Sequence, residues 1–108
     1  HGLKAMDMSG FSDPYVIISV RRRGTLRSKR KTKVVKKNLN PKWDQEFSFQ
    51  VLPSDQIVFE VRDWDRFTKD EPIGNVSLHV SDLPARSETR WLTLSSGGGG
   101  LRVQFTLE

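Results

Sequence analysis

Several short segments of the chain alternate apolar and polar side chains with a period of two residues, and no long segment shows a helical period. One side of residues 46–51 carries Phe47 and Phe49, and one side of residues 56–63 carries Phe59. Such alternation predicts strands that bury one face in a core. By the same pattern, further strands are predicted at residues 15–20, 29–35, 73–80, 91–94 and 101–107.

Stretches rich in Pro, Gly, Asn and Ser separate these segments, as in "NLNPKW", "LPSDQ", "SDLPARSE" and "SSGGGG". Many short strands between turn signals favour an antiparallel β-sandwich. At 108 residues, the chain is predicted to form a single domain over residues 1–108, with one short helical turn at 80–83. The four glycines are predicted to form a surface loop, because no Gly-Lys-Ser/Thr follows them as in a phosphate loop.

The charges are strongly separated along the chain, whose formal net charge is +5. Ten of the 18 Lys and Arg residues lie between Arg21 and Lys37, whereas no Asp or Glu lies between Pro14 and Trp43. The remainder of the chain is therefore acidic, and two poles of opposite charge are expected.

Several classes of function lack the residues they need. The chain has no cysteine, which excludes disulfides, thiol nucleophiles and zinc-thiolate sites and favours a cytoplasmic location. His1 is terminal and His79 lies within a predicted strand, so no catalytic triad or metal-histidine arrangement is visible and we expect no enzymatic activity. No run of about 18 apolar residues is present, so a soluble segment is expected.

The stretch "DWDRFTKDE" gathers four carboxylates after a predicted strand, between Asp63 and Glu71. Clustered carboxylates repel one another, and a hard cation with several oxygen ligands would relieve that repulsion; Ca²⁺ tolerates irregular loops better than Mg²⁺ does. Asp7 and Asp13 precede another strand and are candidates to complete the site. An EF-hand is excluded, because Thr68 stands where its glycine is needed. A solvated acidic surface loop is the alternative.

Three motifs in order, "MDMSGFSDPYV", "KTKVVKKNLNPKWDQEFSF" and "VRDWDRFTKDEPIG", resemble the C2 domain family, the calcium-dependent membrane-binding module of synaptotagmins and conventional protein kinases C. The resemblance covers nearly the whole chain. It implies a sandwich of two four-stranded sheets, with loops at one end that hold two or three Ca²⁺ ions.

The resemblance also implies a ligand set. The first loop would supply Asp7 and Asp13, and the third loop Asp63, Asp65 and Glu71, with Asp13 and Asp63 bridging two ions. The family's fifth acidic position is commonly Asp, so the ligand here is either Glu71 or the adjacent Asp70. Further oxygen ligands would come from the carbonyls of Met6 and Trp64 and, at the outermost site, from Thr68 and the carbonyl of Lys69.

The function implied is calcium-dependent binding to anionic phospholipids that targets a larger, cytoplasmic parent protein, in signalling or vesicle trafficking, to the membrane. Bound Ca²⁺ offsets the carboxylates that would otherwise repel phosphatidylserine, and it leaves positions open for lipid oxygens. Met8, Phe11 and Phe67 are candidates to enter the bilayer interface. Phe11 could instead pack beneath its own loop.

A second membrane contact is predicted on the basic pole. Alternation places Lys29, Lys31 and Lys33 on one face of a strand, where they would suit a phosphoinositide headgroup, as the resemblance implies. Arg21 and Arg23 could add to this patch. A solvated edge strand and a calcium-independent phosphoinositide- or protein-interaction module are the alternatives. Nucleic acid is not expected, because no aromatic residue is interleaved among these charges.

Seven strands are predicted where the family has eight. The first motif begins so near residue 1 that the family's first strand is missing from the N-terminal side. Either that strand is absent, with an edge left for pairing to another chain, or the C-terminal segment "LRVQFTLE" takes its place in a permuted arrangement.

Overall fold

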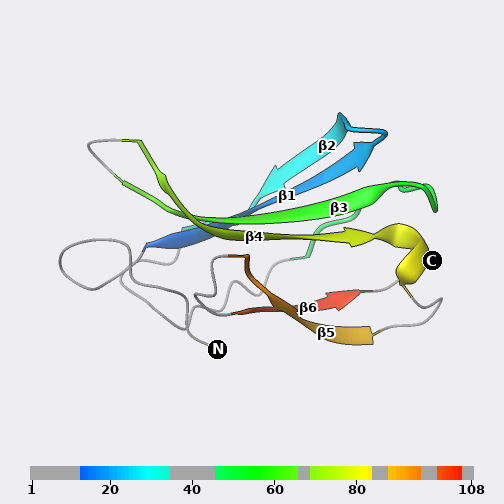
Figure 1. Ribbon diagram of the computed structural model, residues 1–108. Helices are drawn as coiled ribbons and strands as arrows, with labels where there is room; N and C mark the ends of the chain where they lie inside the picture. Colours follow the sequence, from blue (N-terminus) through cyan, green and yellow to red (C-terminus); the bar gives the residue numbers. More distant parts are fainter. Residues whose placement is uncertain (1–12, 35–45, 66–68, 84–87, 96–99, 106–108) are drawn as a thin grey trace.

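The computed structural model describes residues 13–34, 46–65, 69–83, 88–95 and 100–105. This part of the chain is built from antiparallel strands and one 3-10 turn, as the alternation predicted (Figure 1). In chain order the elements are β1 Pro14–Arg22, β2 Thr25–Lys31, β3 Gln56–Asp63, β4 Glu71–His79, η1 Val80–Asp82, β5 Glu88–Thr93 and β6 Gly100–Phe105. No helix among the described residues has the length and apolar character needed to cross a membrane.

The strands form two layers. Figure 1 shows a four-stranded sheet, in the order β2-β1-β3-β4, above a two-stranded sheet of β5 and β6. At one edge the layers are joined by the Ser95 N–H, which donates to the Asn75 carbonyl at 2.9 Å. The sandwich architecture is confirmed, but within the described residues the second sheet has two strands rather than four.

The difference includes residues 46–51, which are described but form no strand. Their side chains still alternate between exposed and half-buried, and Val51 packs against the core, so the predicted amphipathic pattern is present. Alternation alone does not make a strand, because a strand also needs a neighbour that pairs with its backbone N–H and C=O groups. Residues 46–51 lack such a ladder within the described part of the chain.

Most of the other element boundaries are close to those predicted, but β2 is shifted toward the N-terminus. The strand expected at 29–35 is β2, which begins earlier and ends at Lys31. It ends there because the Thr32 hydroxyl accepts the Val16 N–H at 2.9 Å and takes the place of a ladder bond. The helical turn expected at 80–83 is η1. The C-terminal segment forms β6 and pairs with β5, with Leu92 opposite Leu101, whereas residues 1–12 and 106–108 lie outside the described residues.

The core lies between the two sheets. Register places Ile18 opposite Phe59 and Val16 opposite Val61, so these side chains share the inner face of the four-stranded sheet. The rings of Phe59 and Phe105, one from each sheet, meet edge to face with centroids 6.2 Å apart. The buried core cluster comprises Val16, Ile57, Phe59, Val61, Ile73, Val80, Leu83, Leu92, Leu94, Leu101 and Phe105.

A tight turn joins β1 to β2. Arg23 and Gly24 occupy its two central positions with φ of 52° and 80°. Positive φ at both positions matches the type I′ turn, whose twist suits a two-residue hairpin. The hairpin is tied to the turn before β3 by Arg22, whose Nε donates to Oδ1 of the fully buried Asp55 at 2.8 Å.

Candidate functional site

Three strands bring acidic residues to one end of the four-stranded sheet. Because β3 runs antiparallel to both neighbours, its last residue lies beside the first residues of β1 and β4. Pro14 is paired with Asp63, and Asp63 is paired with Glu71. Asp13 precedes Pro14, so the fold brings Asp13 to the same end as Asp63, which lies 50 residues further along the chain, and Glu71.

Backbone hydrogen bonds fix Asp13 against Asp63. The Asp13 N–H donates to Oδ1 of Asp63 at 2.8 Å, and the Trp64 N–H donates to the Asp13 carbonyl at 2.9 Å. The second bond extends the ladder between β1 and β3 past the last paired residue, and the first ties the Asp63 side chain to the Asp13 backbone. Asp63 is 8% exposed, so its carboxylate is held at the rim of the core rather than in bulk water.

The pleat separates the acidic residues between the two faces of the sheet. Asp63 follows Phe59 and Val61 on the inner face, and Glu71, as its paired residue, shares that face. Tyr15 and Arg62 are also paired with each other, and they lie on the outer face. Asp70 contacts this outer pair, so the two adjacent acidic residues of the loop belong to opposite faces.

The Asp70 carboxylate accepts two hydrogen bonds. Its Oδ2 accepts from the Tyr15 hydroxyl at 2.5 Å, and its Oδ1 accepts from the Asp65 N–H at 2.9 Å. Both bonds favour the ionised form, so the Tyr15 hydroxyl first and the Asp65 N–H second hold the pKa of Asp70 below its usual value. Burial, followed by the bond to Asp70, raises the pKa of Tyr15 to about 12.

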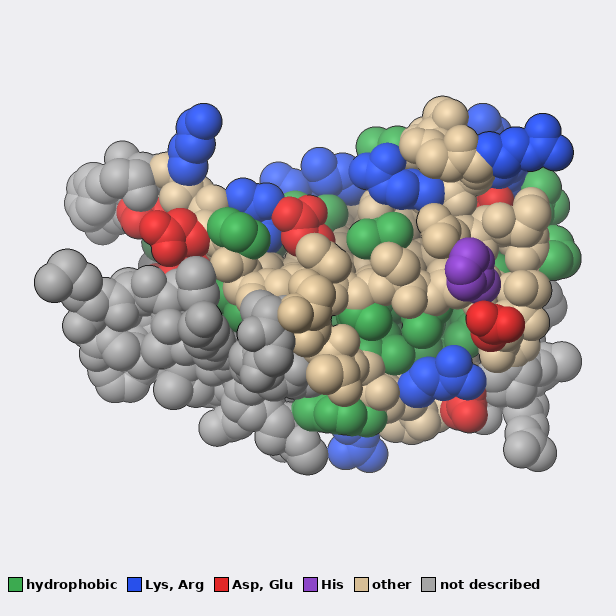
Figure 2. All heavy atoms as spheres, viewed as in Figure 1, with side chains coloured by type: hydrophobic (Ala, Val, Ile, Leu, Met, Phe, Trp, Pro, Cys, Tyr) green, Lys and Arg blue, Asp and Glu red, His purple; other side chains and the backbone are tan. Residues whose placement is uncertain are grey.

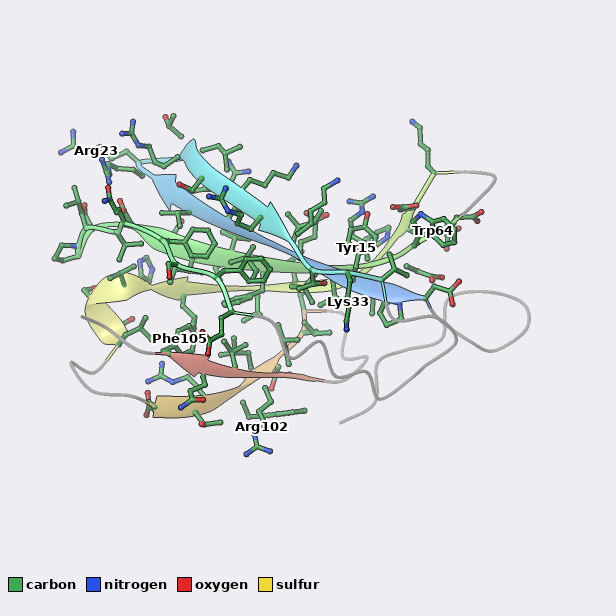
Figure 3. The ribbon with its side chains drawn as sticks, turned by 180° about the vertical axis from the view of Figure 1, so that it is seen from behind. Tyr15, Arg23, Lys33, Trp64, Arg102 and Phe105 are labelled. Carbon is green, nitrogen blue, oxygen red and sulfur yellow. The ribbon has the colours of Figure 1, made fainter. Side chains whose placement is uncertain are left out.

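Arg62 completes this network. Its Nη2 donates to the Asp70 backbone carbonyl at 2.8 Å, and its Nη1 is paired with Oε1 of Glu60 at 2.6 Å. The start and the end of the loop between β3 and β4 are therefore bonded to each other and to the outer face. Figure 3 shows Tyr15 and Trp64 at the end of the sheet where this loop leaves it.

Part of the predicted ligand set lies within the described residues. These are Asp13, Asp63, Asp65 and Glu71, together with Trp64, Lys69 and Asp70. Asp7, Met6 and Thr68 lie outside them, as do the predicted membrane-inserting residues Met8, Phe11 and Phe67. Among the residues that the structure describes, no group of three or more His, Cys, Asp or Glu could hold a metal ion by itself.

The predicted basic patch divides into two places. Lys29 and Lys31 are paired with Ser19 and Ile17, which puts both lysines on the outer face. Lys33 lies beyond the end of β2, and Figure 3 shows its side chain extending toward the level of the second sheet. A regular alternation would have kept it beside Lys31, but the pairing has ended before this position.

The two arginines of the patch lie at the hairpin. Arg21 is the last outward-facing residue of β1 before the turn, where Leu26 opposite it is 46% exposed. Arg23 is in the turn itself. Figure 2 shows Lys and Arg side chains along the β1–β2 hairpin and a group of Asp and Glu side chains near the opposite end, with other side chains of both charges scattered over the same face.

Tyr15 and Arg62 are the residues of this region that the sequence patterns missed. Each reads as an ordinary strand residue, and only the register between β1 and β3 shows that they share a face. The sequence offers one signal for them. A tyrosine directly follows "SDP" in the first motif, and the third motif contains two adjacent acidic residues, one of which could accept its hydrogen bond.

The chain is similar in sequence to proteins of one family. The family model of the C2 domain matches residues 1–94. Synaptotagmin-7 of Homo sapiens is 37% identical over 113 residues, covering 97% of this chain and 28% of that protein. The eye isozyme of protein kinase C from Drosophila melanogaster is 36% identical over 89 residues, covering 80% of this chain and 13% of that enzyme. The chain thus spans less than a third of these relatives.

Solved structures agree on the fold. A C2 domain of plant extended synaptotagmin 1 has a TM-score of 0.82 and 32% identity, covering 95% of this chain and 82% of that one. The calcium-bound pair of C2 domains of extended synaptotagmin 2 gives a TM-score of 0.76 at 27% identity, covering 94% of this chain and 39% of that one.

Proposed function

Because the chain belongs to the C2 domain family, we propose that it binds anionic phospholipid membranes in response to Ca²⁺ and so brings a larger, cytoplasmic protein to the membrane surface. The observation that carries this proposal is the placement of Asp13 and Glu71 on either side of Asp63, at one end of the four-stranded sheet. As a C2 domain the chain is a binding module, and we propose no catalytic role for it.

The donor set suits calcium. Asp63 and Glu71 share one face, Asp13 is bonded to Asp63, and all offer carboxylate oxygens, which are the ligands that hard divalent cations prefer. Asp65 and, from the first loop, Asp7 and the Met6 carbonyl would complete the coordination of two to three ions. The Trp64 carbonyl, Thr68 and the Lys69 carbonyl remain candidates for further ligands.

Charge neutralisation is the proposed switch. Without Ca²⁺ the carboxylates would repel phosphatidylserine, whereas bound ions would offset their charge and would leave positions open to lipid phosphate and carboxylate oxygens. Met8, Phe11 and Phe67 would then enter the interface, where burying apolar surface adds to the attraction.

A separate, calcium-independent contact is proposed for the outer face. Lys29 and Lys31 lie on the same side of β2, and Arg21 lies further along the same face of β1. Three cations on one sheet face suit a phosphoinositide headgroup, whose charge exceeds that of phosphatidylserine. We propose that this patch, with a smaller contribution from Arg23 and Lys33, adds to binding where such lipids are present.

Cosedimentation with vesicles tests both contacts. Vesicles of phosphatidylcholine with phosphatidylserine should pellet the protein in Ca²⁺ but not in chelator, and Asp63→Asn/Asp65→Asn should abolish the difference. Addition of phosphatidylinositol 4,5-bisphosphate should increase pelleting in chelator, and Lys29→Gln/Lys31→Gln should remove that increase. Each cation contributes about 1 kcal/mol near such a surface, so the double lysine variant should bind these vesicles in chelator at least about tenfold more weakly than the wild type does.

The outcomes separate the candidate functions. Equal pelleting of the wild type in Ca²⁺ and in chelator would contradict the calcium switch and would favour a calcium-independent phosphoinositide-interaction module. No pelleting under any condition would favour a protein-interaction module. Glu88→Gln, which removes a carboxylate paired with Arg90 on the second sheet, is the matched control and should behave as the wild type does.

A further inference from the structure

We infer that Asp70 is not a metal ligand but part of a clasp, formed with Tyr15 and Arg62, that fixes the start and the end of the loop between β3 and β4, where Asp63, Asp65 and Glu71 are proposed to bind Ca²⁺. This inference rests on the proposed function of the same end of the sheet. It treats Tyr15 and Asp70 as positioning residues, whereas the resemblance to C2 domains left Asp70 as an alternative to Glu71 for the fifth acidic ligand.

The first argument is the direction of the two adjacent acidic residues. Glu71 is paired with Asp63 and shares its face, whereas Asp70 contacts Tyr15 and Arg62 on the other face. A carboxylate that turned from the outer face toward Asp63 would have to abandon these bonds. The Glu71 side chain is exposed and, among the described residues, makes no hydrogen bond that would have to break. Glu71 is therefore the better placed fifth acidic ligand.

The second argument is that the bonds of Asp70 constrain the loop at separate points. Oδ1 holds the Asp65 N–H, Oδ2 holds the Tyr15 hydroxyl, and the Asp70 carbonyl holds Arg62. Asp65 itself is a proposed ligand, and its backbone N–H is held by the side chain of Asp70, five residues further along the chain. A loop held in this way loses less conformational entropy when an ion binds, which raises its affinity.

The third argument is that Tyr15 is a rigid support. It is 7% exposed and lies in β1, an interior strand of the four-stranded sheet, so its hydroxyl is placed by the sheet and not by the loop. From this fixed position the hydroxyl donates to Oδ2 of Asp70. The ionised Asp70 also leaves one more negative charge near the site, which attracts a cation without contacting it.

The test uses Tyr15→Phe, which removes only the hydroxyl, and Asp70→Asn, with Glu88→Gln as a control for the lost charge. Calcium titration calorimetry should show an affinity about threefold to tenfold weaker for each of the first two variants, with the number of ions unchanged, as expected for a lost hydrogen bond to a charged group. The double variant should be no weaker than Asp70→Asn alone, because both changes open the same clasp.

Amide hydrogen exchange in chelator gives a readout that does not depend on calcium. The Asp65 N–H should exchange faster in Tyr15→Phe and Asp70→Asn than in the wild type, whereas the Phe59 N–H in the centre of β3 should be unaffected. General destabilisation would accelerate both amides and would count against the clasp.

The possible results are distinguishable. If the wild type does not bind Ca²⁺, both the proposed function and the inferred effect of the clasp on calcium affinity are wrong. If the wild type binds Ca²⁺ and Tyr15→Phe binds equally well, the clasp alone is overturned. If Asp70→Asn binds fewer ions than the wild type, Asp70 is a ligand and the inference is wrong.

Discussion

At the scale of single residues, the hairpin turn contains a side chain in a conformation that it does not favour. Arg23 has a φ of 52°, a region that L-residues other than Gly, Asn and Asp rarely adopt. The adjacent Gly24 has a φ of 80° without such a penalty. The strain is local to the turn, so relieving it should not disturb the strands.

Arg23→Gly is therefore expected to raise the free energy of unfolding by about 0.5 to 1 kcal/mol, since it removes the left-handed penalty and costs some chain entropy. Arg27→Gly is the matched control, because it removes the same side chain from β2, where φ is negative, and should lower stability. Urea unfolding at neutral pH would measure both. A loss of stability in both variants would contradict the strain at Arg23.

At the scale of elements, the β1–β2 hairpin depends on one buried carboxylate at the start of β3. Asp55 accepts from Nε and Nη2 of Arg22, at 2.8 and 3.2 Å, and from the Leu52 N–H at 2.8 Å. The Asp55 carbonyl also accepts the Val80 N–H at 2.9 Å. One residue thus joins the hairpin, the turn before β3 and η1 at the end opposite the acidic loop.

Acid should therefore weaken this junction. The Arg22 guanidinium, and then the Leu52 N–H, hold the pKa of Asp55 below its usual value of 3.8. A lowered folded-state pKa contributes stability above the unfolded value, which is lost as the pH falls through the folded value. Asp55→Asn should lower the Tm at pH 7. Between pH 4 and pH 2, roughly the range just below the unfolded pKa, the Tm of the variant should fall less than the Tm of the wild type. Thermal melts against pH test this, and parallel curves would refute it.

At the scale of the whole molecule, the two sheets depend on an aromatic contact across the core. Phe59 is buried in the centre of the four-stranded sheet and meets Phe105 of the second sheet edge to face. Leu92 and Leu101 of the second sheet belong to the same core cluster, so the two layers pack on each other around this contact.

Phe59→Ala should lower the free energy of unfolding by about 3 to 5 kcal/mol, a large part of the roughly 5 to 15 kcal/mol typical of a domain. Trp91→Ala removes a larger ring that is 42% exposed and should cost much less. Equilibrium unfolding in urea would compare them. Similar costs for the two variants would show that the layers are not joined through Phe59.

Local sequence patterns were sufficient to predict most of the strands and the acidic motifs. Alternation reflects which face of a strand is buried, so it predicted β1, β3 and β4 and even the half-buried side of residues 46–51. The three motifs likewise indicated the family. Both signals are local, because each depends on the spacing of a few neighbouring residues.

Register, and with it the set of acidic residues that share a face, is fixed only in the folded chain. The shift in pairing between Val61 and Arg62 sets Asp63 opposite Glu71 and leaves Asp70 with Tyr15, from a strand 55 residues away in sequence. The loop between β3 and β4 interrupts the alternation, so no pattern within it determines on which face its last residues emerge. The pairing of β6 with β5, and the end of β2 before Lys33, are long-range for the same reason: a strand exists only where a distant segment bonds to it.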